Sequence, residues 1–264
     1  RLERLDAVSR RLLRAASIVG EQFWIPAVEE VLGKAQASSL EVVAADLLTQ
    51  ELLVQRRESR FPPLPEYAFR HALIRDAAYE MLSDKERLVG HRAAGRWLEQ
   101  MGEQDARVLA DHAQRGGEAA RSVSQYVRAV EQSFSRNDLE GVFSLVEQGL
   151  GCGAYEEVRG TLLGLRALAR FFSGDMTGCL HDGTEALHAL SPGQPRWYQV
   201  VGALVNAAGL MGRHDTLRTL LTLLRQISPQ PEAAAAKAEA LASVVVMYGL
   251  GGARSRSEEH TSEL

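Results

Sequence analysis

Residues that interrupt helices recur at a nearly constant interval in the second half of this sequence. They fall at Asn137-Asp138, Gly174-Asp175, Gly212 and Gly249, so the spacings are 37, 38 and 37 residues. Segments 154–173 and 176–190 meet at the second interruption, and segments 196–211 and 215–227 meet at the third. A period of this length predicts antiparallel helix pairs over residues 137–253, because each pair has an apolar face that only its neighbours can bury.

Small residues mark the places where these paired helices are expected to touch. Gly178, Cys179, Gly183 and Ala186 lie along one segment, and the run 184–187 resembles the end of a tetratricopeptide (TPR) repeat. The period is slightly longer than that of TPR repeats, and the Trp, Gly and Tyr typical of their first helix are absent. The array is therefore interpreted as an α-α superhelix of degenerate TPR-like repeats, whose groove is expected to bind a protein or peptide partner.

Residues 1–82 carry a different pattern. Apolar spacing predicts short helices at about 4–17, 25–32 and 38–50, and Ser38 with Glu41 fits a capping box at the third. Strands are expected at residues 52–57 and 66–69, separated by a loop with three prolines, which cannot donate ladder hydrogen bonds. The predicted fold class is mainly α. A winged-helix unit with one β-hairpin comes first, then linking helices over residues 83–136, then the repeats.

A winged helix suggests DNA binding, but the expected third helix argues against it. Phosphate contact requires cations, and base reading favours Arg, Lys, Asn and Gln. Residues 38–50 contain Glu41 and Asp46 and neither Lys nor Arg. Arg56, Arg57 and Arg60 are the cations available on the wing. A nucleic-acid partner is therefore not expected.

The segment after the hairpin reads Phe69-Arg70-His71-Ala72-Leu73-Ile74-Arg75-Asp76-Ala77-Ala78-Tyr79-Glu80-Met81-Leu82. It resembles a stretch that closes the winged helix behind the ATPase core of bacterial STAND-class signal-transduction NTPases. The same pattern is fitted by Arg87, His91 and Leu98, and by Leu109-Ala110-Asp111-His112, so the resemblance covers most of residues 1–150. It implies that the winged helix packs on an upstream NTPase domain in cis, which binds ATP or ADP and Mg, instead of on DNA.

The resemblance also implies one candidate nucleotide-contacting residue, His71. In the broader class, a His near this position reaches the nucleotide phosphate in the resting, ADP-bound state. An imidazole at a strand-to-helix junction can donate an N–H to phosphate. The class motif has Met before this His and Asp after it, whereas Arg70 and Ala72 stand here. The alternative is that His71 only bonds backbone within the wing.

Motifs for other chemistry are incomplete. Gly33-Lys34-Ala35 lacks the Ser or Thr of a P-loop, and His91-Arg92-Ala93 lacks the Asp of a kinase catalytic loop. His181, Glu185 and His188 share one helical face, but no second segment supplies further ligands, so no metal site is predicted. We expect no catalytic residue and no cofactor in this chain, and no enzyme activity from it alone.

The ends and the cysteines bear on context. The chain begins at Arg1 within a helical pattern, which suggests a missing upstream domain, and residues 256–264 resemble a translated sequencing adapter, so residues 254–264 are treated as a non-native tail. No apolar run reaches the roughly 20 residues that cross a bilayer. Two cysteines in 264 residues fit a reducing compartment, so a cytoplasmic protein is expected.

Three functional hypotheses follow. The first is a regulatory and protein-interaction segment of a multidomain ATP-dependent signalling protein, linked to a serine/threonine kinase or a cyclase. The glycine-punctuated segment 149–190 resembles the kinase-linked group most. The second is a helical TPR-type scaffold or adaptor with no nucleotide role, and the third is a DNA-binding winged-helix transcription regulator. An upstream Gly-x-x-x-x-Gly-Lys-Ser/Thr motif separates the first from the second.

Overall fold

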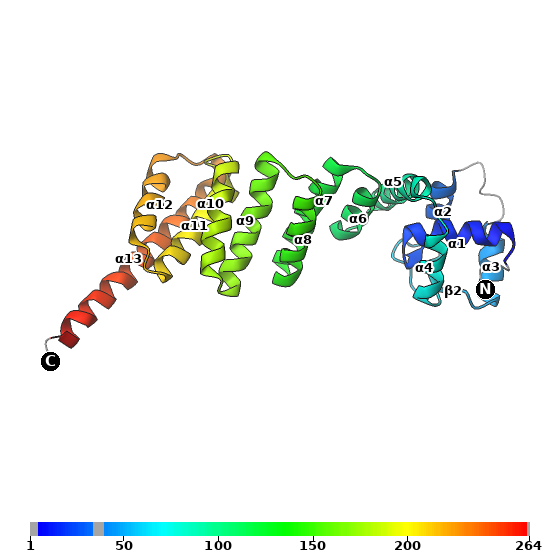
Figure 1. Cartoon of the computed structure of the whole chain (residues 1–264), viewed down its shortest axis with the longest axis horizontal. Coiled ribbons are helices and arrows are strands. Elements are labelled where there is room, and N and C mark those ends of the chain that lie inside the picture. The colour runs from blue at the N-terminus through cyan, green and yellow to red at the C-terminus, as the bar shows by residue number, and fades with distance from the viewer. Residues whose placement is uncertain (1–4, 34–39, 263–264) are drawn as a thin grey trace. The chain divides into compact units, whose positions relative to one another are not determined.

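The computed structural model describes residues 5–33 and 40–262, and only the backbone from residue 250 onward. Most of this part is helical, and a small antiparallel sheet of short strands is present beside turns and loops, so the predicted mainly α class is confirmed (Figure 1). Contacts divide the chain into two units, Arg1–Ser122 and Val123–Leu264.

The first unit begins with the elements of a winged helix. Their order is α1 (Ala7–Val19), β1 (Gln22–Phe23), α2 (Ile25–Leu32), α3 (Leu40–Thr49), β2 (Leu53–Gln55) and β3 (Tyr67–Phe69). The predicted hairpin is present, and β1 adds a third strand that the sequence did not reveal, giving the sheet order β1-β3-β2. Gln22 pairs with Ala68, and Leu53 pairs with Phe69.

Helix α1 begins at residue 7 because Asp6 caps it. The Asp6 carboxylate accepts hydrogen bonds from the backbone N–H groups of Val8 and Ser9, at 2.8 and 3.0 Å. Such a cap satisfies donors that have no partner within the helix. Ser38, the cap expected for α3, lies outside the described residues.

Three further helices complete the first unit: α4 (Ala72–Glu80), α5 (Asp84–Gln100) and α6 (Ala106–Arg115). Trp97 of α5 enters the core of the winged helix, where its ring centroid lies 5.6 Å from that of Trp24 and 5.7 Å from that of Phe61. Leu98 and Leu109 belong to the same hydrophobic core. The boundary expected at residue 82 therefore falls inside a continuously packed unit.

The second unit consists of consecutive helices. They are α7 (Ala119–Ser135), which starts at the end of the first unit, α8 (Leu139–Gly151), α9 (Glu156–Ser173), α10 (Met176–Ala189), α11 (Pro195–Leu210), α12 (His214–Gln226), the 3-10 turn Pro231–Ala233, and α13 (Ala234–Ser262). The two helix pairs predicted from the sequence correspond to α9–α10 and α11–α12, within about two residues at each end. No described residue after Ser83 is in a strand.

Two of the predicted interruptions combine a left-handed residue with a helix cap. Asn137 and Gly174 have φ of 58° and 87°, a conformation that Gly and Asn adopt most readily. The following Asp138 and Asp175 accept hydrogen bonds from backbone N–H groups of the next helix, at 2.9 and 2.8 Å. One helix is thus ended and the next begun within two residues.

The fourth predicted interruption is wrong, because Gly249 lies inside α13. A lone glycine costs a helix only about 1 kcal/mol relative to alanine. Leu250 follows it, so no side chain is present to cap a new helix, in contrast to the Asp after Asn137 and Gly174. The same helix continues through residues 254–262, part of the segment treated above as a non-native tail.

The small residues expected between paired helices are buried as predicted. Cys179 and Ala186 have no exposed surface. A Cβ on Gly183 would lie 2.6 Å from a methyl of Leu204 in α11, so only glycine allows this approach. The close packing of α10 on α11 therefore depends on the absence of a side chain at this position.

Candidate functional site

The surface of α3 is where a DNA-binding winged helix would meet the major groove. Leu40, Ala44 and Leu47 hold this helix to the core. Its exposed positions are Glu41, Val42, Ala45, Asp46 and Thr49. Val42 is 71% exposed, and the helix presents two carboxylates and no cation. This face therefore offers no cation that could pair with a phosphate.

Two of the three wing arginines are already paired with carboxylates. Arg60 Nη1 lies 2.5 Å from Glu103, and its guanidinium stacks over the Trp24 ring at 5.4 Å. Arg56 Nε lies 3.3 Å from Glu66. Both carboxylates are nearly fully buried. Arg56 and Arg60 therefore neutralise buried charge, and they are less available to contact a phosphate.

His71, the residue predicted to contact nucleotide, lies at the junction of β3 and α4. It occupies the N-cap position of α4 without a side-chain capping bond, and it is exposed. Within the described residues its side chain makes no capping hydrogen bond to the first turn of α4. Leu73, two residues on, is 80% exposed. An imidazole placed in this way is available to a group on another domain.

The neighbouring Arg75 and Asp76 form a surface ion pair at 2.6 Å. Arg75 also lies 3.3 Å from Glu21. Exposed pairs of this kind contribute little to stability.

A buried chain of hydrogen bonds joins three residues that the sequence did not connect. The Tyr79 hydroxyl lies 2.9 Å from Nε2 of His91, and Nδ1 of His91 lies 3.1 Å from Nδ1 of His112. The backbone carbonyl of Val19 acts to raise the pKa of His112. His91 lies on α5 and His112 on α6, and nothing in the sequence showed that the two rings meet.

An arrangement of protons with two neutral rings satisfies this chain. Nδ1 of one histidine donates to Nδ1 of the other, and the Tyr79 hydroxyl donates to or accepts from Nε2 of His91 according to the tautomer. Both rings are neutral in this arrangement.

The electrostatic surroundings favour the same neutral state. Burial lowers the pKa of His91 to about 3, helped by the nearby His112, Arg115 and Arg87. Burial also lowers the pKa of His112, against the opposing effect of Asp111. Arg87 stacks over the Tyr79 ring at 4.7 Å. These histidines join α4, α5 and α6 as neutral partners.

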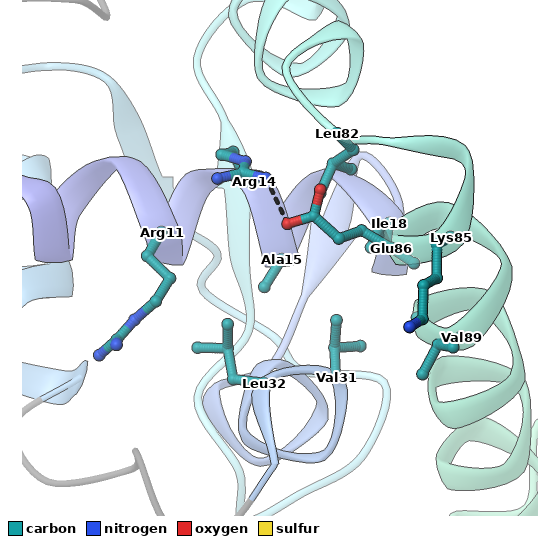
Figure 2. Close-up of a pocket in the computed structure, with 11 residues that line it drawn as sticks. Arg11, Arg14, Ala15, Ile18, Val31, Leu32, Leu82, Lys85, Glu86 and Val89 are labelled. Carbon is teal, nitrogen blue, oxygen red and sulfur yellow. Dashed lines mark hydrogen bonds and ion pairs between the residues drawn. The ribbon is translucent and has the colours of Figure 1, made fainter.

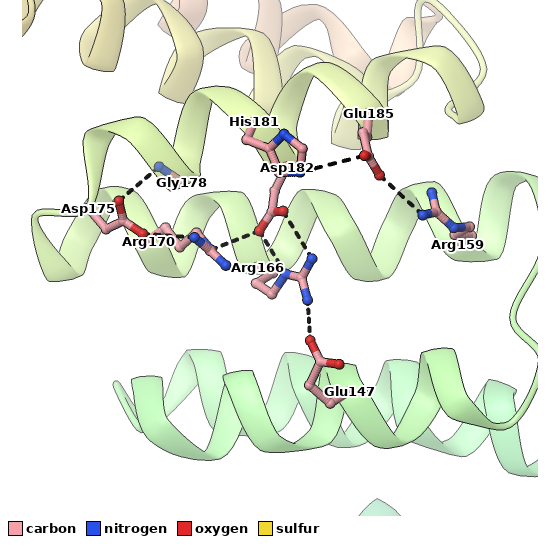
Figure 3. A network of polar contacts seen from close by, with 9 residues as sticks. All are labelled: Glu147, Arg159, Arg166, Arg170, Asp175, Gly178, His181, Asp182 and Glu185. Atoms are coloured by element: carbon pink, nitrogen blue, oxygen red, sulfur yellow. Dashed lines mark hydrogen bonds and ion pairs between the residues drawn. The ribbon is translucent and has the colours of Figure 1, made fainter.

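In the second unit a buried carboxylate ties helices α8, α9 and α10 together. Asp182 of α10 is 1% exposed and receives two bonds from Arg166, at 2.7 and 2.9 Å. Nε of Arg170 lies 2.8 Å from the same carboxylate, and Arg166 also contacts Glu147 of α8 (Figure 3). Figure 3 shows the Asp182 carboxylate between the two guanidinium groups. The arrangement fixes the helix register.

A hollow in this unit lies against α10, α11 and α12 and measures about 590 Å³. Trp197, Leu204, Leu187, Leu220 and Leu223 line it, with polar groups such as Thr184 and His188. Its volume lies within the range of pockets that bind ligands or anchor side chains. The sequence did not identify any groove-lining residue, because lining depends on how successive pairs are rotated.

On the polar face of α10 that was considered for metal binding, side chains form ion pairs with one another and with α9. His181 lies 3.6 Å from Glu185, which also lies 3.1 Å from Arg159. Among the described residues no three His, Cys, Asp or Glu side chains are placed to hold a metal. Within the same part of the chain, no helix combines the length and apolar character needed to cross a membrane.

The fold defines a class: a winged-helix unit extended by three further helices, followed by TPR-like helix pairs. No family model and no solved structure matches the chain. The chain is similar to the uncharacterized protein R02095 of Rhizobium meliloti (strain 1021), with 31% identity over 168 residues. That match covers 60% of this chain and 15% of the relative, so the chain spans a small part of the relative's length.

Proposed function

We propose that this chain is the regulatory and interaction segment of a multidomain, ATP-dependent bacterial signalling protein of the STAND class. The winged-helix unit packs on an NTPase core in the same protein, and the helix pairs bind a protein partner in the cytoplasm. The exposed face of α3 carries the proposal, because it offers Glu41, Val42 and Asp46 where a DNA-binding protein places cations.

Exposed aliphatic side chains support protein contact at this unit. Val42 on α3 and Leu73 on α4 are 71% and 80% exposed. The pairing of Arg56 and Arg60 with buried carboxylates supports the same reading, because it leaves Arg57 as the one wing arginine without a described ion pair. A DNA-binding role is therefore the weaker alternative.

The nucleotide would be held by the upstream core, and this chain contributes a single candidate contact to it. His71 is exposed at a helix start and can present a ring N–H to a phosphate on another domain. Loss of that contact on exchange of ADP for ATP would release the winged helix and the repeats together. Such a switch is biased by ligand binding to one of two states.

The match to a much longer relative supports a role as one part of a multidomain protein. The kinase-linked group is the finer proposal, based on the glycine-punctuated segment 149–190. A TPR-type adaptor without a nucleotide partner is the competing function, and upstream sequence lacking Gly-x-x-x-x-Gly-Lys-Ser/Thr would favour it.

ADP retention by the full-length protein tests the proposal. Val42→Glu places a further carboxylate on the α3 face, so we expect it to weaken docking and to speed ADP loss. His71→Ala should also speed ADP loss, whereas Arg57→Gln serves as the matched control and should not. If Val42→Glu retains ADP as well as the parent protein does, α3 is not the docking face. If His71→Ala does so, only the proposed contact between His71 and phosphate is ruled out.

Fluorescence anisotropy with a labelled random-sequence duplex at low salt tests the DNA-binding alternative. We expect no saturable binding by the 264-residue chain. Binding that weakens steeply with added salt, and that Arg57→Gln abolishes, would favour the DNA-binding role.

A further inference from the structure

The hollow against α10, α11 and α12 is bounded mainly by apolar side chains. Trp197 and Leu204 line it from α11, and each is only 2% exposed. Leu187 of α10 and Leu220 and Leu223 of α12 line it from the two neighbouring helices. Its volume of about 590 Å³ lies within the range of sites that hold a small molecule.

The hollow is elongated along α10 and α12. Its lining residues run from Leu180 to His188 on α10 and from Asp215 to Ile227 on α12. The segment from Leu180 to His188 corresponds to about 12 Å of helix, at a rise of about 1.5 Å per residue. A molecule that is longer than it is wide therefore fits this shape.

The lining is almost free of charge. Among the described lining residues, Asp215 is the only Asp, Glu, Lys or Arg. Its side chain is 97% exposed and lies 2.8 Å from Arg218, which neutralises it. The hydroxyls of Thr184 and Thr219 donate to helix carbonyls, at 2.7 and 3.1 Å. An ionic group that entered the hollow would lose hydration without gaining an opposite charge.

The hollow of the first unit has a different character. It lies between α1, α2 and the start of α5 and measures about 390 Å³ (Figure 2). Figure 2 shows Arg14 paired with Glu86 at its wall, and the two atoms in contact lie 2.5 Å apart. Lys85 also lines it. These charged groups make that hollow less suited to an uncharged body than the one in the second unit.

We propose that the hollow against α10, α11 and α12 binds a small uncharged molecule, with an elongated aliphatic body and a single hydroxyl or carbonyl group. The body covers Trp197, Leu204 and Leu220. The polar group lies beside His188, which is exposed and can exchange a hydrogen bond with it. A small molecule is preferred to a partner helix because three helices of this unit already line the hollow. This site does not depend on the function proposed above.

Isothermal titration of the 264-residue chain with straight-chain alcohols tests the site. The probes are 1-butanol, 1-hexanol and 1-octanol, with sodium octanoate and n-octyltrimethylammonium as charged compounds that carry a similar tail. We expect 1-octanol to bind at one site per chain, and affinity to rise about three- to fourfold for each added CH₂. Both charged compounds should bind at least about tenfold more weakly than 1-octanol, because the hollow offers no counter-charge.

Two threonines of α12 provide a matched pair of substitutions. Thr219 and Thr222 are both exposed, and each donates its hydroxyl to the carbonyl four residues earlier. Of the two, Thr219 lines the hollow. Thr219→Trp should fill it and weaken 1-octanol binding at least about tenfold, whereas Thr222→Trp should leave binding unchanged. Val89→Trp, at the wall of the hollow in Figure 2, should also leave binding unchanged.

Thermal melts followed by circular dichroism establish that each variant is folded. The site is overturned by any of three results. The first is equal binding of 1-octanol and octanoate, which would indicate adsorption of the tail without regard to the charge of the hollow. The second is equal affinity in Thr219→Trp and Thr222→Trp, or a loss in Val89→Trp alone, which would place the alcohol elsewhere. The third is absence of binding by 1-octanol up to its solubility limit.

Discussion

His91 and His112 share a hydrogen bond between their Nδ1 atoms, and this bond requires that one of the two atoms carry no proton. Protonation of both rings would place two N–H groups against each other. Both rings are buried, and the Tyr79 hydroxyl contacts Nε2 of His91. The network is therefore a source of acid sensitivity inside the first unit.

Acidification should destabilise this unit. Above about pH 6.5 His91 is neutral in both the folded and the unfolded chain, so it adds no pH dependence. Below that value the unfolded chain takes up a proton that the folded chain refuses, down to the folded pKa of about 3. Between pH 7 and 5, His91 alone should lower the free energy of unfolding by about 2 kcal/mol.

Urea unfolding at several pH values, followed by tryptophan fluorescence, measures this effect. His91→Gln should flatten the pH dependence while lowering stability at pH 7. His188→Gln, on an exposed position of α10, should leave the pH dependence as in the parent chain. A pH dependence equally steep in His91→Gln would show that another group is responsible.

Single residues also mark the limit of what the sequence could predict. The sequence showed that α3 carries no cation, because the composition of a single segment can be determined without knowing which residues it contacts. The partners of the wing arginines were not: Arg60 pairs with Glu103, 43 residues away, and such a contact follows only from the packing of α5 and α6 on the wing. The His91–His112 contact was hidden for the same reason.

At the scale of elements, the helix-ending signals worked where two residues acted together. Asn137-Asp138 and Gly174-Asp175 supply a left-handed residue and a cap in succession. Gly212, with φ of 67°, ends α11 without an Asp beside it, and Arg213 offers no side-chain cap. Gly249 has neither property, which explains why counting glycines predicted one interruption too many.

Alanine at the two glycines should therefore have opposite effects. A Cβ would meet nothing within 4 Å at Gly212 or at Gly249. The effect of alanine on stability therefore depends on the backbone conformation at each position. Gly212→Ala forces alanine into the left-handed region and should cost about 1–2 kcal/mol. Gly249→Ala should stabilise α13 by up to about 1 kcal/mol. Equal destabilisation by both, in urea unfolding, would restore Gly249 as an interruption.

The Asp182 network gives a second prediction for elements. Asp182→Asn leaves Arg166 and Arg170 facing a neutral group in a buried place, and should cost about 3 kcal/mol in unfolding free energy. Asp215, which is 97% exposed and pairs with Arg218, is the matched control. Asp215→Asn should change the free energy of unfolding by less than about 0.5 kcal/mol. Equal effects would mean that the buried network adds no stability.

For the whole molecule, periodicity and turn chemistry were sufficient to predict the class and most helices. The strand β1 was missed because two residues, Gln22 and Phe23, carry no alternation that a sequence can show. The extension of the first core into α5 and α6 was missed because it depends on Trp97 meeting Trp24. Which surface binds a partner depends on pair rotation, which no local pattern encodes.

At the scale of the whole molecule, the proposed function requires that α3 act as a protein-docking face. Hydrogen–deuterium exchange of α3 tests this directly, when the 264-residue chain is compared with the full-length protein in ADP and in a non-hydrolysable ATP analogue. We predict slower exchange of residues 40–49 in the ADP-bound full-length protein than in the isolated chain, and a return toward the isolated rate with the ATP analogue. Identical exchange of α3 in all three samples would contradict the account.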